Sequence, residues 1–303
     1  MLKLARSNQQ KAQHFLATQS RPLEQSLFAY YFQSGSREAV LAELAKFQNT
    51  DGGFGHALEP DLRLPDSSVI ATTVALQILR SLQAQSDQPL VQGALRYLLD
   101  TYDSEQKVWP IAPSNTRDAP CAPWWSDPRA FDWRFNPRPE IIGYFYDYAD
   151  LIPANSRDEL IEAVVVYLES LPDLTDQHDS VSCYARLAET TTLPETIRAR
   201  ILDKLKRMVA LSISRNPADW GGYVFKPLKL VHSPDSPFAA LLADVVALNL
   251  DYEIERQGDD GAWGPNWSWS GNYPEVWEIA RREWQGRLTL DMLLTLRAFD
   301  RLE

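Results

Sequence analysis

Cysteine and basic side chains are scarce in this sequence. Its 303 residues include two cysteines, Cys121 and Cys183, which lie far apart and give no disulfide framework, as is typical of a reducing compartment. Lys and Arg number 30 against 41 Asp and Glu, and the net charge is -11. Such a charge provides no basic field for nucleic acid or anionic lipid, and a diphosphate ligand would need a local Arg/Lys cluster or a metal. We therefore expect no nucleic-acid partner.

Long apolar runs are also missing. The start of the chain, residues 1–6, lacks the apolar core of a signal sequence. The most apolar stretch, residues 69–79, is interrupted by Thr and Gln. We expect no transmembrane segment and interpret the chain as a soluble, cytoplasmic protein.

Alternation of polar and apolar residues, the signal of a β-strand, never extends beyond a few positions. The apolar residues recur with helical spacing instead, and at 45% of the chain they are sufficient for a core. Helices are predicted at residues 9–31 with an interruption at Pro22, 37–47, 69–82, 90–99, 140–148, 157–168, 181–189, 197–212, 238–255 and 290–299. Thr289 is expected to cap the last of them.

Two segments share the pattern Gln-x-x-x-Gly-x-aromatic. We name residues 48–54 (QNTDGGF) clasp 1 and residues 257–263 (QGDDGAW) clasp 2. The pattern predicts a sharp turn at the Gly, an aromatic ring folded back over that turn, and a Gln side chain that binds the freed backbone groups. We expect Phe54 and Trp263 to be structural.

Helix ends recur along the chain near residues 51, 109, 172, 219 and 260. Their spacing of about 40 to 60 residues is typical of repeat architectures, and each period holds one helical pair. About six such pairs close a two-layered ring. We therefore predict an all-α fold, an α/α toroid of about six helical hairpins with inner and outer helix rings, as a single domain over residues 1–303.

Both clasps resemble the Gln-Trp repeat motif of the terpenoid cyclase and protein prenyltransferase superfamily, which includes the squalene–hopene cyclases. The likeness is strong over residues 48–76 and 257–298, and between them it lies mainly in the rhythm of helices. The resemblance implies an α/α-barrel with a central aromatic cavity that takes isoprenoids. It does not imply a particular reaction.

The catalytic motifs of that superfamily are absent. The chain has no Asp-x-Asp-Asp cluster, with which cyclases protonate an alkene, and no Asp-Asp-x-x-Asp, with which they hold magnesium and a diphosphate. The nearest acids are Glu59, Asp61 and Asp66. The sequence identifies no cofactor.

The loop over residues 55–67 follows clasp 1 and is expected to approach the mouth of a cavity. It carries the four candidate catalytic residues His56, Glu59, Asp61 and Asp66. Carboxyl groups beside an imidazole, one of them kept protonated by burial, can act as general acid and base. Alternatively, Asp66 is the N-cap of the next helix, while Glu59 and Asp61 pair with Arg63.

Aromatic residues next to acids suggest where a ligand would be bound. The candidate substrate-binding residues are Trp124, Trp125, Asp127 and Trp133 in one loop, and Trp267 and Trp269 in another. Large rings beside carboxylates either cover an apolar cavity, where they can stabilise a cation, or stack on sugar faces. Packing over the end of the fold is the alternative.

A metal site is not predicted. The prenyltransferase resemblance implies zinc held by Asp, Cys and His with Asp-x-Cys spacing, and the weak candidates here are Asp179, Cys183 and His232. Asp179 and Cys183 are four residues apart and would share one helix face. Zinc sites usually show tighter spacing.

Three functional hypotheses follow. The first is an isoprenoid-binding, terpene cyclase-like enzyme with Asp61, Asp66 or Glu59 as proton donor in an aromatic cavity. The second is a glycan-active hydrolase or lyase, which requires two carboxylates across a cleft. The third is a non-catalytic binding or scaffold protein. A closed apolar cavity would favour the first hypothesis and an open acidic groove the second.

Overall fold

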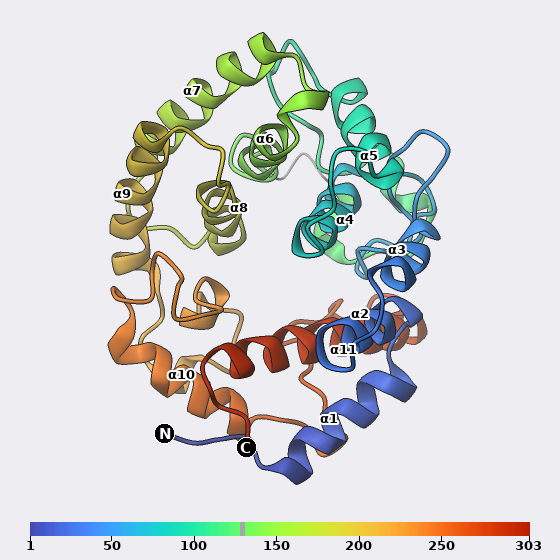
Figure 1. Cartoon of the computed structure of the whole chain (residues 1–303), viewed down its shortest axis with the longest axis vertical. Coiled ribbons are helices and arrows are strands. Elements are labelled where there is room, and N and C mark those ends of the chain that lie inside the picture. Colours follow the sequence, from blue (N-terminus) through green and yellow to red (C-terminus); the bar gives the residue numbers. More distant parts are fainter. Residues whose placement is uncertain (128–130) are drawn as a thin grey trace. The chain divides into compact units, whose positions relative to one another are not determined.

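The computed structural model describes residues 1–127 and 131–303. This part of the chain contains eleven α-helices and no β-strand, and isolated bridges join only single residue pairs (Figure 1). The prediction of an all-α fold is confirmed. No helix in these two stretches is long and apolar enough to cross a membrane. The chain forms two compact units: Met1–Lys46 with Ile213–Glu303 (unit 1), and Phe47–Ser212 (unit 2).

Unit 2 consists of helical hairpins in two layers. Its helices are α4 (Val69–Ser81), α5 (Pro89–Asp100), α6 (Arg138–Asp147), α7 (Ala154–Ser170), α8 (His178–Ala188) and α9 (Glu195–Ser212). Helix α6 packs against both α4 and α8, α7 packs against α9, and α4, α6 and α8 each contact the helix that follows (Figure 1). This pairing matches the expected hairpins, whereas closure into a toroid and the single domain stay predictions.

Local sequence signals begin the helices of unit 2. Ser68 caps α4, because its Oγ accepts a hydrogen bond of 3.1 Å from the backbone N–H of Ala71. The interpretation of Asp66 as this N-cap is therefore wrong. Pro89 occupies the first turn of α5, where its missing N–H costs no hydrogen bond. Short 3₁₀ turns, η1 (Thr116–Asp118), η2 (Pro123–Ser126) and η4 (Ala149–Leu151), lie in the longer connections.

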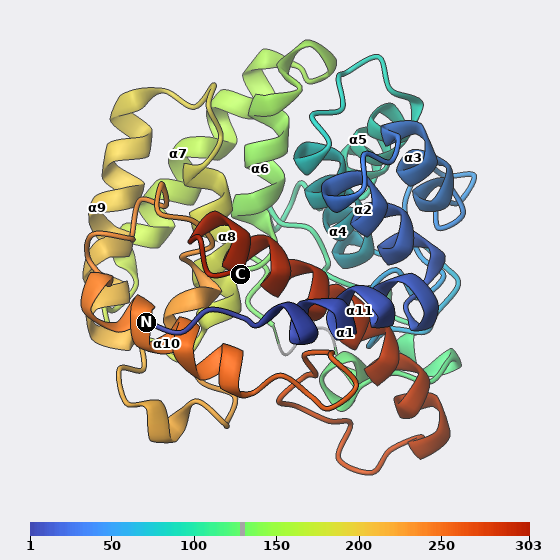
Figure 2. The same cartoon turned by 60° about the horizontal axis from the view of Figure 1, so that its bottom comes forward.

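Unit 1 combines both ends of the chain. Its helices are α1 (Arg6–Gln19), α2 (Pro22–Phe32), α3 (Arg37–Ala45), α10 (Ala243–Glu255) and α11 (Pro274–Ala298), with 3₁₀ turns η5 (Pro217–Asp219) and η6 (Pro227–Lys229). Helices α1, α2 and α11 contact one another, and α2 contacts α3. The termini pair directly: Leu4 N–H donates to the carbonyl of Arg301 at 2.7 Å, and Glu303 N–H donates back to Leu4 at 3.2 Å (Figure 2).

Two helix boundaries near the C-terminus were predicted wrongly. Helix α11 begins at Pro274 instead of residue 290, with the proline in the first turn, so Thr289 lies inside the helix and does not cap it. Helix α10 begins at Ala243, and residues 238–242 form turns.

Candidate functional site

The two clasps have the same backbone geometry. In clasp 1, Gln48 Nε2 donates to the carbonyl of Gly52 at 2.9 Å, and in clasp 2, Gln257 Nε2 donates to Gly261 at 2.8 Å. The two glycines have φ values of 90° and 88°, which side chains other than glycine rarely adopt. The predicted turn and the role of Gln are therefore confirmed.

Each clasp is also held by an Asp that the sequence reasoning missed. The backbone N–H of Gly53 donates to Asp51 Oδ1 at 2.9 Å, and that of Ala262 donates to Asp260 Oδ1 at 3.0 Å. An Asp at the same position of both motifs was the available signal. A short acidic side chain that binds a backbone N–H two residues on is a common turn device.

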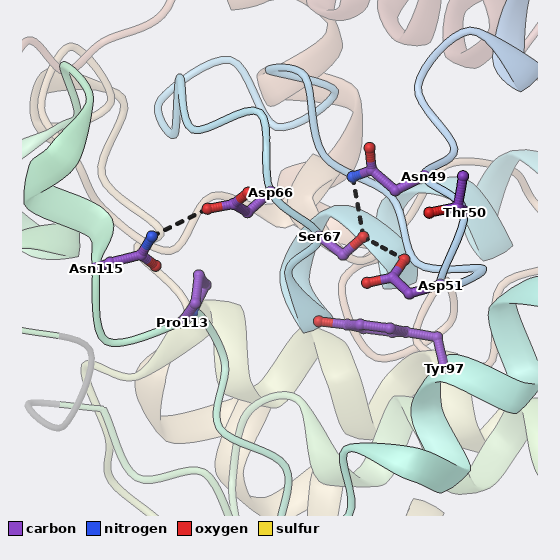
Figure 3. A pocket seen from close by; sticks show the side chains of 8 residues that line it. All are labelled: Asn49, Thr50, Asp51, Asp66, Ser67, Tyr97, Pro113 and Asn115. Carbon is purple, nitrogen blue, oxygen red and sulfur yellow. Dashed lines mark hydrogen bonds between the residues drawn. The ribbon is translucent and has the colours of Figure 1, made fainter.

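Clasp 1 carries polar side chains that clasp 2 lacks. Asn49 Nδ2 donates to Ser67 Oγ at 3.0 Å, and Ser67 Oγ donates to Asp51 Oδ1 at 2.8 Å (Figure 3). The position of Asn49 is Gly258 in clasp 2, which has no side chain. Since clasp 2 folds without such a residue, the turn itself does not require Asn49.

A pocket of about 480 Å³ opens beside clasp 1 (Figure 3). It is lined by Asn49, Thr50, Asp51, Asp66, Ser67, Tyr97, Pro113 and Asn115. Tyr97, from α5, is only 9% exposed, yet its hydroxyl makes no hydrogen bond to any residue that the structure describes. Burial, together with the nearby Asp51, raises the pKa of Tyr97. The phenol therefore stays protonated at neutral pH and is available as a hydrogen-bond donor.

Hydrogen-bond acceptors dominate the rest of the pocket. Asp66 Oδ2 accepts from Asn115 Nδ2 at 3.0 Å. Among the described residues no donor binds Asp66 Oδ1, Asp51 Oδ2 or Asn115 Oδ1. The pocket lining contains two carboxylates and no Lys or Arg in the described part of the chain. It therefore suits a ligand rich in donors and disfavours an anion such as a diphosphate.

The structure brings together two loops that the sequence singled out separately. The N–H of Ala122 donates to the carbonyl of Asp61 at 2.8 Å, and the N–H of Arg63 donates to Pro120 at 3.2 Å. Leu62 and Cys121 form a bridge between the same segments. The loop of candidate acids and the loop of tryptophans thus lie side by side.

The four candidate catalytic residues have different environments. Asp66 lines the pocket, while His56 is exposed and has Nε2 at 2.8 Å from Asn49 Oδ1. Glu59 and Asp61 are buried, at 7% and 2% exposure, and do not line the pocket. Their pairing with Arg63 stays a prediction. Of the four, Asp66 is the residue with direct access to a ligand in this pocket.

The candidate aromatic residues are also divided. Trp124 on η2 is 36% exposed, Trp125 beside it is buried, Asp127 is exposed and Trp133 is partly buried. In unit 1, Trp269 has no exposed surface and packs 5.7 Å from Trp277, while Trp267 packs 5.2 Å from Trp284. A ligand has no open surface of Trp269 to contact in this structure.

No group of three or more His, Cys, Asp or Glu residues is arranged to hold a metal in residues 1–127 and 131–303. Asp179 and Cys183 lie on α8 as expected, whereas His232 belongs to unit 1. Burial raises the pKa of the Cys183 thiol, which disfavours the thiolate that zinc requires. Cys121 and Cys183 are both free and buried.

A buried polar cluster in unit 2 was not predicted. Glu140 on α6 accepts from Tyr144 at 2.5 Å and from Gln77 at 2.8 Å, and it pairs with Arg186 at 2.7 Å. These partners come from α4, α6 and α8. The cluster holds three helices together. The Glu140 carboxylate is bound by partners within the protein. No sequence motif marks it, since its members come from distant positions.

Compared with models of known protein families and with curated proteins, the chain matches none.

Proposed function

We propose that this protein is glycan-active and holds a sugar in the pocket beside clasp 1. The observation that carries the proposal is Tyr97, a side chain nine-tenths buried whose unpaired hydroxyl lines a pocket of free acceptors (Figure 3). The ring of Tyr97 is held in place by burial, while its hydroxyl is accessible at the pocket and can donate a hydrogen bond to a ligand that enters.

Sugar hydroxyls match the polar groups of this pocket. Each hydroxyl can donate to a free carboxylate or amide oxygen of Asp51, Asp66 or Asn115 and accept from another group. Tyr97 and Thr50 supply hydroxyl donors at the same pocket. The few convergent polar groups would set the orientation of the ring.

Two carboxylates in one pocket also provide the groups needed for glycoside hydrolysis. Asp66, whose Oδ1 is free of donors in the described part of the chain, is proposed as the acid or base that contacts the sugar. Asp51 is the second carboxylate, although its Oδ1 is used by the clasp turn. A carboxylate separation of about 5 to 5.5 Å would give retention and about 6.5 to 9.5 Å inversion.

Calorimetric titration of the full chain with neutral mono- and oligosaccharides tests the proposal. Tyr97→Phe should weaken binding about tenfold without lowering stability, because the deleted hydroxyl has no protein partner to lose. Tyr148→Phe, an equally conservative change at a buried tyrosine outside the pocket, should leave binding unchanged. Binding of no saccharide, or equal binding by Tyr97→Phe, would sink the proposal.

A terpene cyclase-like or prenyltransferase-like enzyme is the second candidate. The support for this candidate is the geometry that the two clasps share, because both clasps resemble the repeat motif of that superfamily. The same resemblance implies a closed α/α toroid. Native mass spectrometry with isoprenoid diphosphates and squalene-like lipids tests this candidate, and failure of both to bind would remove it. We also propose a cytoplasmic location, supported by the two free cysteines.

A further inference from the structure

We propose that the preferred ligand of the clasp 1 pocket is an amino sugar whose free ammonium group binds at Asp51 and Asp66. The proposal rests on the glycan function proposed above and specifies its substrate class. Two properties of the pocket favour an amino sugar over a neutral sugar: its negative charge and its number of free hydrogen-bond acceptors.

Charge is the first argument. Asp51 and Asp66 are exposed carboxylates on the pocket lining, and the described lining residues include no Lys or Arg to neutralise them. Their remaining neighbours in the pocket are neutral: two amides, two hydroxyls, a phenol and a proline. A cation entering the pocket is attracted by both carboxylates, and water screens this attraction only in part.

Donor number is the second argument. An ammonium group donates three hydrogen bonds and accepts none. The pocket presents three oxygens that bind no donor among the described residues: Asp51 Oδ2, Asp66 Oδ1 and Asn115 Oδ1 (Figure 3). A sugar with an ammonium group in place of one hydroxyl therefore brings two more donors to these acceptors than the neutral sugar does, and its hydrogen bonds to a carboxylate are charge-assisted.

Tyr97 gives an independent indication that the pocket binds a ligand that is also polar elsewhere. It is nine-tenths buried and its unpaired hydroxyl lines the same pocket, where it can bind a ring hydroxyl. A simple amine would leave that hydroxyl to water. The pocket therefore combines a place for an ammonium group with a place for a sugar hydroxyl.

Clasp 2 shows which of the polar side chains at the pocket the clasp turn requires. Asp260 caps the turn of clasp 2 as Asp51 caps that of clasp 1, yet Gly258 stands where clasp 1 has Asn49. The turn accounts for one oxygen of Asp51 and for none of Asp66. Asp66 and Asn115 are thus available for recognition.

The test is calorimetric titration of the full chain with three matched oligosaccharides: one with free amines, its N-acetylated counterpart and its neutral hydroxyl counterpart. At low salt, and at a pH where the amine is protonated, the amino form should bind about tenfold more tightly, as two screened carboxylates predict. Asp66→Asn should remove most of this difference, and 0.5 M salt should reduce it. Asp87→Asn, at an exposed acid outside the pocket, should leave the difference intact.

Two further ligands distinguish the ways in which the inference can fail. Equal binding of all three oligosaccharides would overturn the amino-sugar preference and leave the glycan function standing, whereas binding of none would overturn both. An aliphatic diamine that binds as tightly as the amino sugar would show that the pocket recognises amines without a sugar. Calcium alone, bound in the wild type and lost in Asp66→Asn, would show a metal site instead. Either result overturns the inference.

Discussion

Thr72 Oγ1 accepts a hydrogen bond of 3.0 Å from the backbone N–H of Phe54, which ties clasp 1 to helix α4. The same bond recurs in unit 1, where Thr289 Oγ1 accepts from the N–H of Trp263 at 2.9 Å. Both threonines are fully buried. A clasp is therefore a turn anchored on the helix that follows it, and the threonine is as much a part of it as the Gln.

Thr72→Val should lower the free energy of unfolding by about 1 to 3 kcal/mol, because it leaves the buried N–H of Phe54 without an acceptor. Thr72→Ser keeps the hydroxyl and should lose much less. Urea unfolding of the two variants measures the difference. A larger loss in Thr72→Ser than in Thr72→Val would mean that the methyl group, and not the hydrogen bond, stabilises the clasp.

Gly52→Ala should destabilise the protein by more than about 2 kcal/mol, because the residue has φ 90° and a Cβ would lie 2.4 Å from the carbonyl oxygen of Gly93. Gly271→Ala is the matched control, since Gly271 has φ 83° but no atom within 4 Å of its Cβ position. The control should show only the cost of the backbone conformation. Thermal melts compare the two, and an equal effect would contradict the steric argument.

Ser68→Ala should cost about 1 kcal/mol of stability through loss of the N-cap of α4, whereas Asp66→Ala should be nearly neutral. The denaturant midpoints of the two variants measure the two losses of stability. A larger loss in Asp66→Ala would restore Asp66 to a structural role and weaken its assignment to ligand binding.

Glu140→Gln should destabilise the protein by about 3 kcal/mol, because it leaves the Arg186 guanidinium, which is only 32% exposed, without its carboxylate. Glu162→Gln breaks a surface pair with Arg200 and should leave stability unchanged within error. Equilibrium unfolding in guanidinium chloride compares them. If the two changes cost the same, the buried cluster does not hold α4, α6 and α8 together.

Alkaline pH should unfold the protein in part through Tyr148. Burial, with Asp147 nearby, raises the pKa of Tyr148 to about 12. The unfolded chain ionises near pH 10 while the folded phenol stays neutral, so this stabilisation is complete below pH 10 and is lost between pH 10 and 12. Tyr148→Phe should reduce the loss over this range by about 2 kcal/mol, measured by urea titration at each pH. An unchanged slope would contradict the assignment.

Helix positions followed from local sequence wherever a standard signal was present. Pro89 begins α5 and the apolar spacing of residues 69–82 predicted α4 to within one residue of Val69–Ser81. The start of α11 was predicted 16 residues too late, at residue 290, although Pro274 provides the usual signal of a proline in the first helical turn. Local propensity thus predicts an element where its own residues provide most of the signal.

The sequence by itself determined that the chain is helical, that two Gln-x-x-x-Gly-x-aromatic turns recur, and that Asp66 lies in the loop that follows clasp 1. Only the tertiary structure decided that Asp66 meets Asn115 and Tyr97 at one pocket, while Glu59 and Asp61 are buried. The physical reason is the distance along the chain between the residues that interact. Turns and helices depend on neighbours along the chain, whereas a pocket depends on side chains that long-range packing brings together from distant positions.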